Sequence, residues 1–248
     1  MNSVRKVLAT LTLLLVWCTL GPVVGVLGMI YTLVVRDITR FYWTGMGVVR
    51  LGLRAAGVRV RVLGLDNVPT TQSCIFMCNH VSNMDPPVLM PIIPGRSSVL
   101  LKKGLMSIPI LGTAMRMAGF IPIERGNTAM PRREAAQASV TAAGKALASG
   151  LHIVVFPEGT RSADGRLSTF KKGPFFLAMQ TGAPIIPVAM AGTERMMPKG
   201  TALVAPGVVT VQMLPAIHPA DYASRDELMQ AVRASIANAL PAPMQPII

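Results

Sequence analysis

The sequence predicts an α/β fold: a mostly parallel sheet flanked by helices, preceded by an N-terminal hydrophobic helical membrane segment. Beyond residue 57, short apolar runs typical of buried strands alternate with helix-like stretches, which is the pattern of α/β layers. Before residue 57, an uncharged block of about 29 residues (7–35) is apolar enough to contact lipid. We therefore expect a membrane-embedded helical hairpin and interfacial helix in residues 1–57 and an α/β domain in residues 58–248.

The uncharged block is bracketed by basic residues, with Arg5 and Lys6 before it and Arg36 after it. One long tilted span and a hairpin broken at Gly21-Pro22 both fit its length. Each arm of such a hairpin would be about 20 Å long, short of the roughly 30 Å hydrocarbon core, so the hairpin would dip into one leaflet and return. Basic residues favour the cytoplasmic side and flank both ends of the block, so we favour the hairpin.

The next stretch, residues 38–56, places Arg40, Arg50 and Arg54 among aromatic and apolar residues. This mixture is typical of an amphipathic helix that lies at a membrane interface. We therefore expect a helix here that continues the lipid-contacting part of the chain.

Strands and helices are predicted in alternation from residue 58 onward. The strands are expected at residues 58–63, 74–78, 98–101, 120–123, 152–156, 184–190 and 208–214. The helices are expected from residue 86 and at residues 111–117, 131–149, 174–180 and 225–239. The helix at 131–149 has the clearest signature, with proline at its start, an alanine-rich body and glycine just past its end. The proline-rich tail, residues 241–248, is expected to be loosely ordered.

The segment Asn79-His80-Val81-Ser82-Asn83-Met84-Asp85 follows a predicted buried strand and precedes Pro86. Five steps along a helix place two side chains roughly 140° apart, and five steps along a strand place them on opposite faces, so only a turn can join His80 to Asp85. Asp85 before a proline is typical of a helix N-cap. A carboxylate on one imidazole nitrogen leaves the other free to accept a proton, so the pair is a candidate general base and its orienting acid. A structural histidine beside a capping aspartate is the alternative.

The same segment resembles the His-x4-Asp motif of the glycerolipid acyltransferases typified by 1-acylglycerol-3-phosphate acyltransferase. Three further blocks are similar to that family's motifs in the same order: Gly-Phe-Ile-Pro-Ile-Glu-Arg at 119–125, Phe-Pro-Glu-Gly-Thr-Arg-Ser at 156–162 and Ile-Pro-Val at 186–188. No departure is seen at the positions that define the motifs. The resemblance implies that residues 58–248 are an acyltransferase catalytic domain, with His80 and Asp85 as its catalytic pair.

Candidate substrate-binding residues follow two predicted strands. Arg125 ends one of them, and the loop with Glu158, Gly159, Thr160 and Arg161 follows another, at the carboxyl end where open α/β sheets usually bind ligands. Gly159 lets a ligand approach the backbone, and an arginine offers a planar fork of donors for phosphate oxygens. The alternative is that both arginines are solvated surface charge and that Glu158 pairs with one of them.

The resemblance implies transfer of a fatty acyl group from acyl-CoA or acyl carrier protein to the hydroxyl of lysophosphatidic acid (1-acylglycerol 3-phosphate), which yields phosphatidic acid. Other acceptors within the family are lyso-ornithine lipid, other lysophospholipids and glycerol 3-phosphate. A lipase or thioesterase is disfavoured because the chain has no Gly-x-Ser-x-Gly elbow. We expect the catalytic domain on the cytoplasmic face of a bacterial-type inner membrane or another cytosol-facing membrane.

Composition points to acidic partners, since the formal net charge is +13 and the pI is about 10.7. Nucleic acid is disfavoured because aromatic residues are 5% and the basic residues are scattered, whereas anionic lipid headgroups suit a chain with a lipid-contacting segment.

The cysteines Cys18, Cys74 and Cys78 show no metal or redox spacing, so we expect reduced thiols. His152 and His218 lack nearby acidic partners, so no metal site is expected. No cofactor is expected either, with acyl-CoA or acyl carrier protein serving as the acyl-donor substrate.

Overall fold

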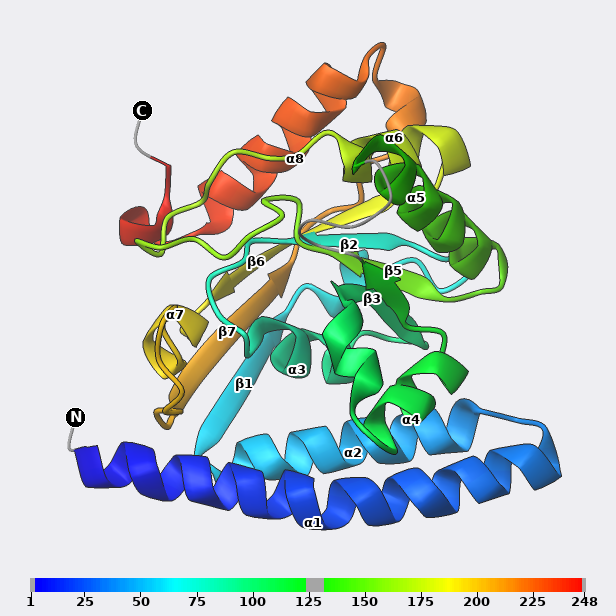
Figure 1. The fold of residues 1–248 in the computed structure, drawn as a ribbon. Helices are drawn as coiled ribbons and strands as arrows, with labels where there is room; N and C mark the ends of the chain where they lie inside the picture. Colours follow the sequence, from blue (N-terminus) through cyan, green and yellow to red (C-terminus); the bar gives the residue numbers. More distant parts are fainter. Residues whose placement is uncertain (1–2, 124–131, 247–248) are drawn as a thin grey trace.

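The computed structural model describes residues 3–123 and 132–246 (Figure 1). Its strands are β1 (Val58–Leu63), β2 (Ile75–Cys78), β3 (Ser97–Lys102), β4 (Ile121–Ile123), β5 (His152–Val155), β6 (Ile185–Ala191) and β7 (Gly207–Met213). Its α-helices are α1 (Ser3–Val35), α2 (Thr39–Ala55), α3 (Asp85–Leu89), α4 (Leu111–Met117), α5 (Arg132–Ala148), α6 (Gly173–Thr181), α7 (Thr193–Met196) and α8 (Arg225–Ala239). Every predicted strand and helix is present, and bounds shift by a few residues at most.

The seven strands form one sheet in the order β1-β7-β6-β2-β5-β3-β4. Within the described residues the strand pairings are parallel, except that β6 and β7 are antiparallel. The predicted α/β fold with a mostly parallel sheet is confirmed. β2 lies between β6 and β5, and all four of its residues are buried, which explains why its sequence is apolar without alternation.

Two apolar cores fill the two faces of the sheet. One joins side chains of β2, β6 and β7 to α3 and to Leu13 of α1 and Leu53 of α2. The other joins the opposite faces of β2, β5 and β6 to α5, α6 and α8. Figure 1 shows the same layering, with α1 and α2 below the sheet and α5, α6 and α8 above it.

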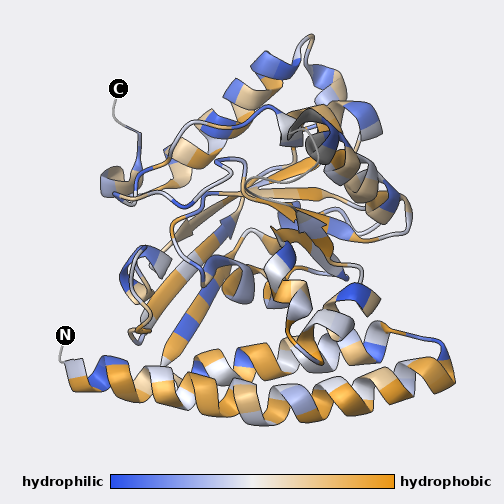
Figure 2. Cartoon of the chain, viewed as in Figure 1, coloured by the Kyte–Doolittle hydropathy of each residue, from blue (hydrophilic) through white to orange (hydrophobic). Residues whose placement is uncertain are grey.

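α1 is one continuous helix, so the break predicted at Gly21-Pro22 is wrong. Pro22 lies inside the helix, where it removes one hydrogen-bond donor, and the apolar residues on both sides continue the helical ladder. The helix is about 50 Å long at helical rise and is long and apolar enough to cross a membrane. Hydrophobic residues run along its length (Figure 2), and Leu8, Leu15 and Leu27 are more than half exposed. This surface indicates membrane association.

The hairpin in the structure is formed by α1 and α2, which lie side by side (Figure 1). Glycines permit their close approach: a Cβ at Gly28 would meet the ring of Phe41 at 2.0 Å, and one at Gly52 would meet Trp17 Nε1 at 2.2 Å. α2 is also attached to the sheet, because the hydroxyl of buried Tyr42 accepts the Ser97 N–H at 3.0 Å. The two helices are therefore packed on the α/β domain rather than tethered to it.

We expect Gly52→Ala to destabilise the protein by about 1–3 kcal/mol, because the added methyl group overlaps the indole of Trp17. Gly45→Ala in the same helix is the matched control, since a Cβ there meets nothing within 4 Å. Removing that helical glycine should be neutral or stabilise the fold by up to roughly 1 kcal/mol. Thermal unfolding midpoints in detergent would check both variants, and equal shifts would contradict the helix packing described here.

The C-terminal tail is more ordered than predicted. Residues Ala242–Met244 form a 3-10 turn, and Met244 is buried with an exposed fraction of 5%. The Met244 side chain packs with Leu167 and Leu240 in the core on the α8 side, and burial of that apolar side chain outweighs the tendency of a chain end to fray. Residues 247 and 248 lie outside the described residues.

Candidate active site

The loop between β2 and α3 brings His80 and Asp85 together, as predicted. Nδ1 of His80 lies 2.7 Å from Oδ2 of Asp85. The same oxygen accepts the backbone N–H groups of Val81 at 2.8 Å and Ser82 at 2.9 Å. Asp85 is fully buried, and His80 keeps 13% of its side chain exposed. The imidazole therefore turns Nδ1 to the carboxylate, and the described part of the chain offers Nε2 no hydrogen-bond partner.

The predicted N-cap role of Asp85 is wrong by one residue. α3 begins at Asp85, and Met84 takes the N-cap position without a side-chain bond. The Asp85 carboxylate is instead engaged by the loop that precedes it, where it can accept two N–H groups and the imidazole at once. Asp85 thereby closes the loop and orients His80 with one oxygen.

A second loop, residues 157–170 after β5, holds the backbone of His80 on both sides. Oε1 of Glu158 accepts the His80 N–H at 2.6 Å, and the Ser162 N–H donates to the His80 carbonyl at 2.8 Å. Phe156 stacks on the imidazole with ring centroids 4.2 Å apart and planes 24° apart. Backbone bonds fix the position of His80, and the stacked ring restrains its plane.

Glu158 does not pair with an arginine in the described part of the chain. Its second oxygen accepts the Ser168 N–H at 2.9 Å, and the side chain is 2% exposed. Burial raises the pKa of this carboxyl, and the two N–H donors act in the opposite direction. Since both oxygens are bonded to the protein, the geometry favours a positioning role for Glu158 over the predicted direct contact with substrate.

Three other predicted binding residues, Gly159, Thr160 and Arg161, follow Glu158 in the same loop. Gly159 has a φ of +74°, a left-handed conformation that favours glycine. Thr160 is exposed and Arg161 is half-buried. The bond from Ser162 to the His80 carbonyl places the backbone beside Arg161 next to the candidate base. Arg125 lies outside the described residues.

Comparison with known proteins identifies the family of this chain. The model of the family described as Acyltransferase matches residues 59–191, more than half of the 248-residue chain. The chain belongs to the acyltransferase family. The matched region contains both loops around His80 and the strands that carry them.

Relatives of this acyltransferase include the 1-acyl-sn-glycerol-3-phosphate acyltransferase of Limnanthes douglasii, 33% identical over 77% of this chain and 66% of that protein. The human protein 1-acyl-sn-glycerol-3-phosphate acyltransferase alpha is 32% identical over 65% of this chain and 56% of that one. The chain thus spans about half to two thirds of the length of such relatives. The crystal structure of the 1-acyl-sn-glycerophosphate acyltransferase PlsC from Thermotoga maritima matches with a TM-score of 0.82 at 26% identity, over 96% of both chains.

Two polar residues at the candidate site were not predicted. Asn79 is buried and bonds both ways with the backbone of Met190, through Nδ2 at 2.9 Å and Oδ1 at 2.8 Å. Ser82 is buried and donates to the carbonyl of Met197 at 2.8 Å. Both tie the His80 loop to β6 and the segment after it. For Asn79 the available signal was a polar residue directly at the end of an apolar strand.

The cysteines near the site are buried and free. Burial raises the pKa of Cys74 to about 11 and that of Cys78 well above its ordinary value. A thiolate is therefore disfavoured at both positions, which supports the expected core role of Cys78 over that of a nucleophile.

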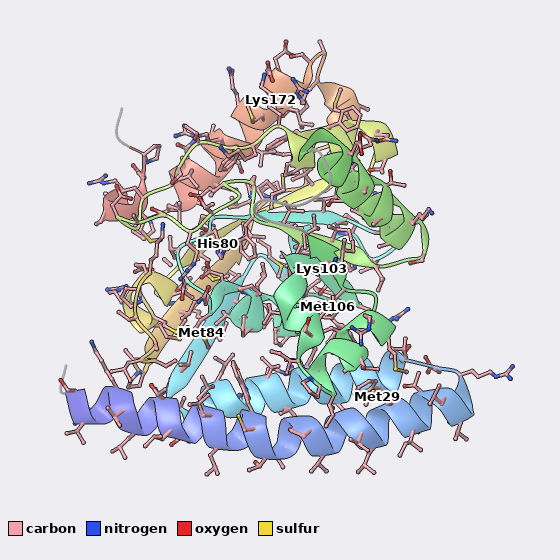
Figure 3. All side chains as sticks on the ribbon, viewed as in Figure 1. Met29, His80, Met84, Lys103, Met106 and Lys172 are labelled. Carbon is pink, nitrogen blue, oxygen red and sulfur yellow. The ribbon has the colours of Figure 1, made fainter. Side chains whose placement is uncertain are left out.

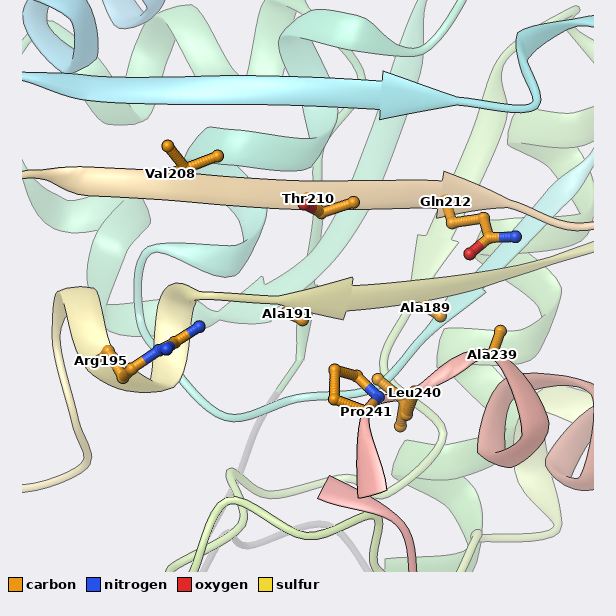
Figure 4. Close-up of a pocket in the computed structure, with 9 residues that line it drawn as sticks. All are labelled: Ala189, Ala191, Arg195, Val208, Thr210, Gln212, Ala239, Leu240 and Pro241. Atoms are coloured by element: carbon orange, nitrogen blue, oxygen red, sulfur yellow. The ribbon is translucent and has the colours of Figure 1, made fainter. Parts of the chain in front are cut away.

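A cavity of about 320 Å³ lies elsewhere, on the α8 side of β6 and β7 (Figure 4). Arg195, Thr210, Gln212 and Leu240 are among its lining residues, and none of the predicted site residues is. His80 points away from it: the imidazole stacks on Phe156, which packs against the core on the α1 and α2 side. Figure 3 shows His80 above Met84, with Met29 of α1 farther below.

Proposed function

We propose that the protein transfers a fatty acyl group from acyl-CoA or acyl carrier protein to the free hydroxyl of 1-acylglycerol 3-phosphate, forming phosphatidic acid. The 2.7 Å contact between His80 and Asp85 carries this proposal, because it leaves one imidazole nitrogen available as a base. Membership in the acyltransferase family and the names of its relatives support the choice of substrates.

In this mechanism Nε2 of His80 takes the proton from the lysolipid hydroxyl as its oxygen attacks the thioester carbonyl. The C–O bond forms, the C–S bond breaks, and the imidazolium returns its proton to the departing thiolate. Asp85 stabilises the transient imidazolium and keeps the ring in the required tautomer. No covalent acyl-enzyme is required, in keeping with the burial of Cys78.

Arg161, with Arg125, is proposed to hold the phosphate of the lysolipid. A guanidinium can bind two phosphate oxygens at once. Among the described residues, no side chain forms a hydrogen bond or an ion pair with the guanidinium of Arg161. Gly159 and Thr160 line the approach to this arginine. Glu158 holds the base in position by accepting the His80 N–H.

The substrate and the product are both lipids, so we propose that residues 1–57 hold the enzyme at the membrane with the α/β domain on the cytoplasmic face. Exposed leucines of α1 would enter the lipid, and exposed Arg54 of α2 and Arg59 and Arg61 of β1 would face anionic headgroups. Each such basic residue contributes about 1 kcal/mol near an anionic surface.

The proposed function is tested by assaying the purified full chain with several acceptors against both donor classes and identifying products by mass. Lysophosphatidic acid, lyso-ornithine lipid, another lysophospholipid and glycerol 3-phosphate would each be offered with acyl-CoA and with acyl carrier protein. We expect phosphatidic acid to be the preferred product. Preferred acylation of another acceptor, or release of free fatty acid without consumption of acceptor, would refute the assignment.

We expect Arg161→Ala to raise the KM for lysophosphatidic acid by about tenfold or more, since a charged hydrogen bond to phosphate is worth roughly 1.5–3 kcal/mol. The kcat should change little if the phosphate is held equally in the ground state and the transition state. Arg233→Ala, which removes a half-buried arginine of α8, is the control. Steady-state kinetics in mixed micelles would measure both, and unchanged constants for Arg161→Ala would remove it from the site.

A further inference from the structure

We propose that the C-terminal tail, residues 241–245, is a positioning element for His80. This proposal rests on the proposed function in taking His80 as the base. The tail is bonded to the loop of residues 157–170: the Leu167 N–H donates to the Met244 carbonyl at 2.9 Å, and Nη1 of Arg166 donates to the Gln245 carbonyl at 3.1 Å. Both contacts join residues more than seventy positions apart, so they form only in the folded chain.

The loop transmits this support to the base through Glu158. The Ser168 N–H, next to the Leu167 anchor, donates to one oxygen of Glu158, and the other oxygen accepts the His80 N–H. Near its other end, the loop donates the Ser162 N–H to the His80 carbonyl. Two hydrogen-bonded links, joined by the peptide bond between Leu167 and Ser168, therefore connect the tail to Glu158 and His80.

Apolar packing follows the same path. Met244, Leu167 and Phe170 are buried in one cluster with Val81, the residue that follows His80. At its start the tail borders the cavity of Figure 4, which Leu240 and Pro241 line. Apart from bonds within the tail and one from Gln245 to the Leu240 carbonyl at the end of α8, the hydrogen bonds of the tail among the described residues are with the loop that holds His80.

Removing the contact between the tail and the loop should lower the rate of acyl transfer more than it weakens binding of the lysolipid. Nothing in the tail is bonded to Arg161, whose carbonyl instead accepts from Lys199. A shift of about 1 Å in a catalytic group can cost on the order of a hundredfold in rate. The expected signature is a lower kcat with a nearly unchanged lysolipid KM.

The test compares two truncations of the full chain in detergent. Ending the chain after Leu240 removes the whole tail and should lower kcat about tenfold to a hundredfold, with the KM for lysophosphatidic acid changed less than twofold. Ending it after Gln245 keeps every named contact and should retain full kcat. Met244→Ala should reproduce part of the loss, and Met244→Leu, which keeps an apolar side chain of similar size, should restore it.

Hydrogen exchange by mass spectrometry provides a readout that does not depend on activity. In the chain ending after Leu240, exchange should accelerate at the amides of His80 and Ser168 and stay unchanged in β5 and β6. An equal acceleration across the sheet, a raised KM at constant kcat, or unchanged kcat would overturn the proposal. Wild-type protein without transferase activity would refute the proposed function, while the exchange result would still decide whether the tail holds His80.

Discussion

Replacing His80 by asparagine is expected to lower kcat for acyl transfer by a factor of about 10²–10⁴, the usual contribution of a positioned base. An asparagine amide can still donate to Oδ2 of Asp85, which lies 2.7 Å from Nδ1 of the native imidazole, but it cannot accept the substrate proton. His80→Asn therefore separates loss of the base from loss of the loop structure. His80→Ala should lose at least as much activity and also destabilise the loop, because it removes a donor to the buried Asp85 carboxylate.

His218→Ala is the matched control, since His218 is exposed on the loop after β7. It should retain the wild-type kcat and KM. Initial rates of phosphatidic acid formation would be read alongside thermal midpoints for all three variants. Full activity in His80→Asn would show that the imidazole is not the base, and a loss that merely tracked unfolding would show a structural role.

Asp85→Asn is expected to produce a comparable loss, on the order of 10²–10⁴ in kcat, for a different reason. The Asp85 oxygen that orients His80 also accepts the N–H groups of Val81 and Ser82. An asparagine oxygen could keep these bonds, but its neutral amide would no longer stabilise the imidazolium that forms when the base takes its proton. It would also place an N–H₂ group where Oδ1 is buried without a partner among the described residues.

The two effects of Asp85→Asn are distinguishable. The unsatisfied buried amide should lower the free energy of unfolding by about 1–3 kcal/mol, and the lost charge should lower kcat in protein that is still folded. Combining Asp85→Asn with His80→Asn tests their coupling: the double variant should be no slower than His80→Asn, because Asp85 acts through the base. Additive losses would mean that Asp85 contributes independently of His80.

Local sequence signals predicted most of the elements because the signals agreed with the tertiary context. The helix expected at 225–239 and the one at 111–117 have those bounds, and each strand was located to within about two residues. The helix break predicted at Gly21-Pro22 does not occur. A proline removes one backbone hydrogen bond, and the long apolar helix around it tolerates this loss. The tail was expected to be loose because its local sequence contains no sign of the loop that Met244 packs against.

The sequence by itself determined the membrane-associated helix, the α/β class and the proximity of His80 to Asp85, because hydropathy, periodicity and a short turn act over neighbouring residues. Only the tertiary structure decided what holds that pair: the bond of Glu158 to the His80 N–H crosses 78 positions, and that of Asn79 to Met190 crosses 111. Such partners are selected by parallel strand pairing, which brings the ends of β2, β5 and β6 to one edge of the sheet. The spacing of these residues along the chain does not predict that strand pairing.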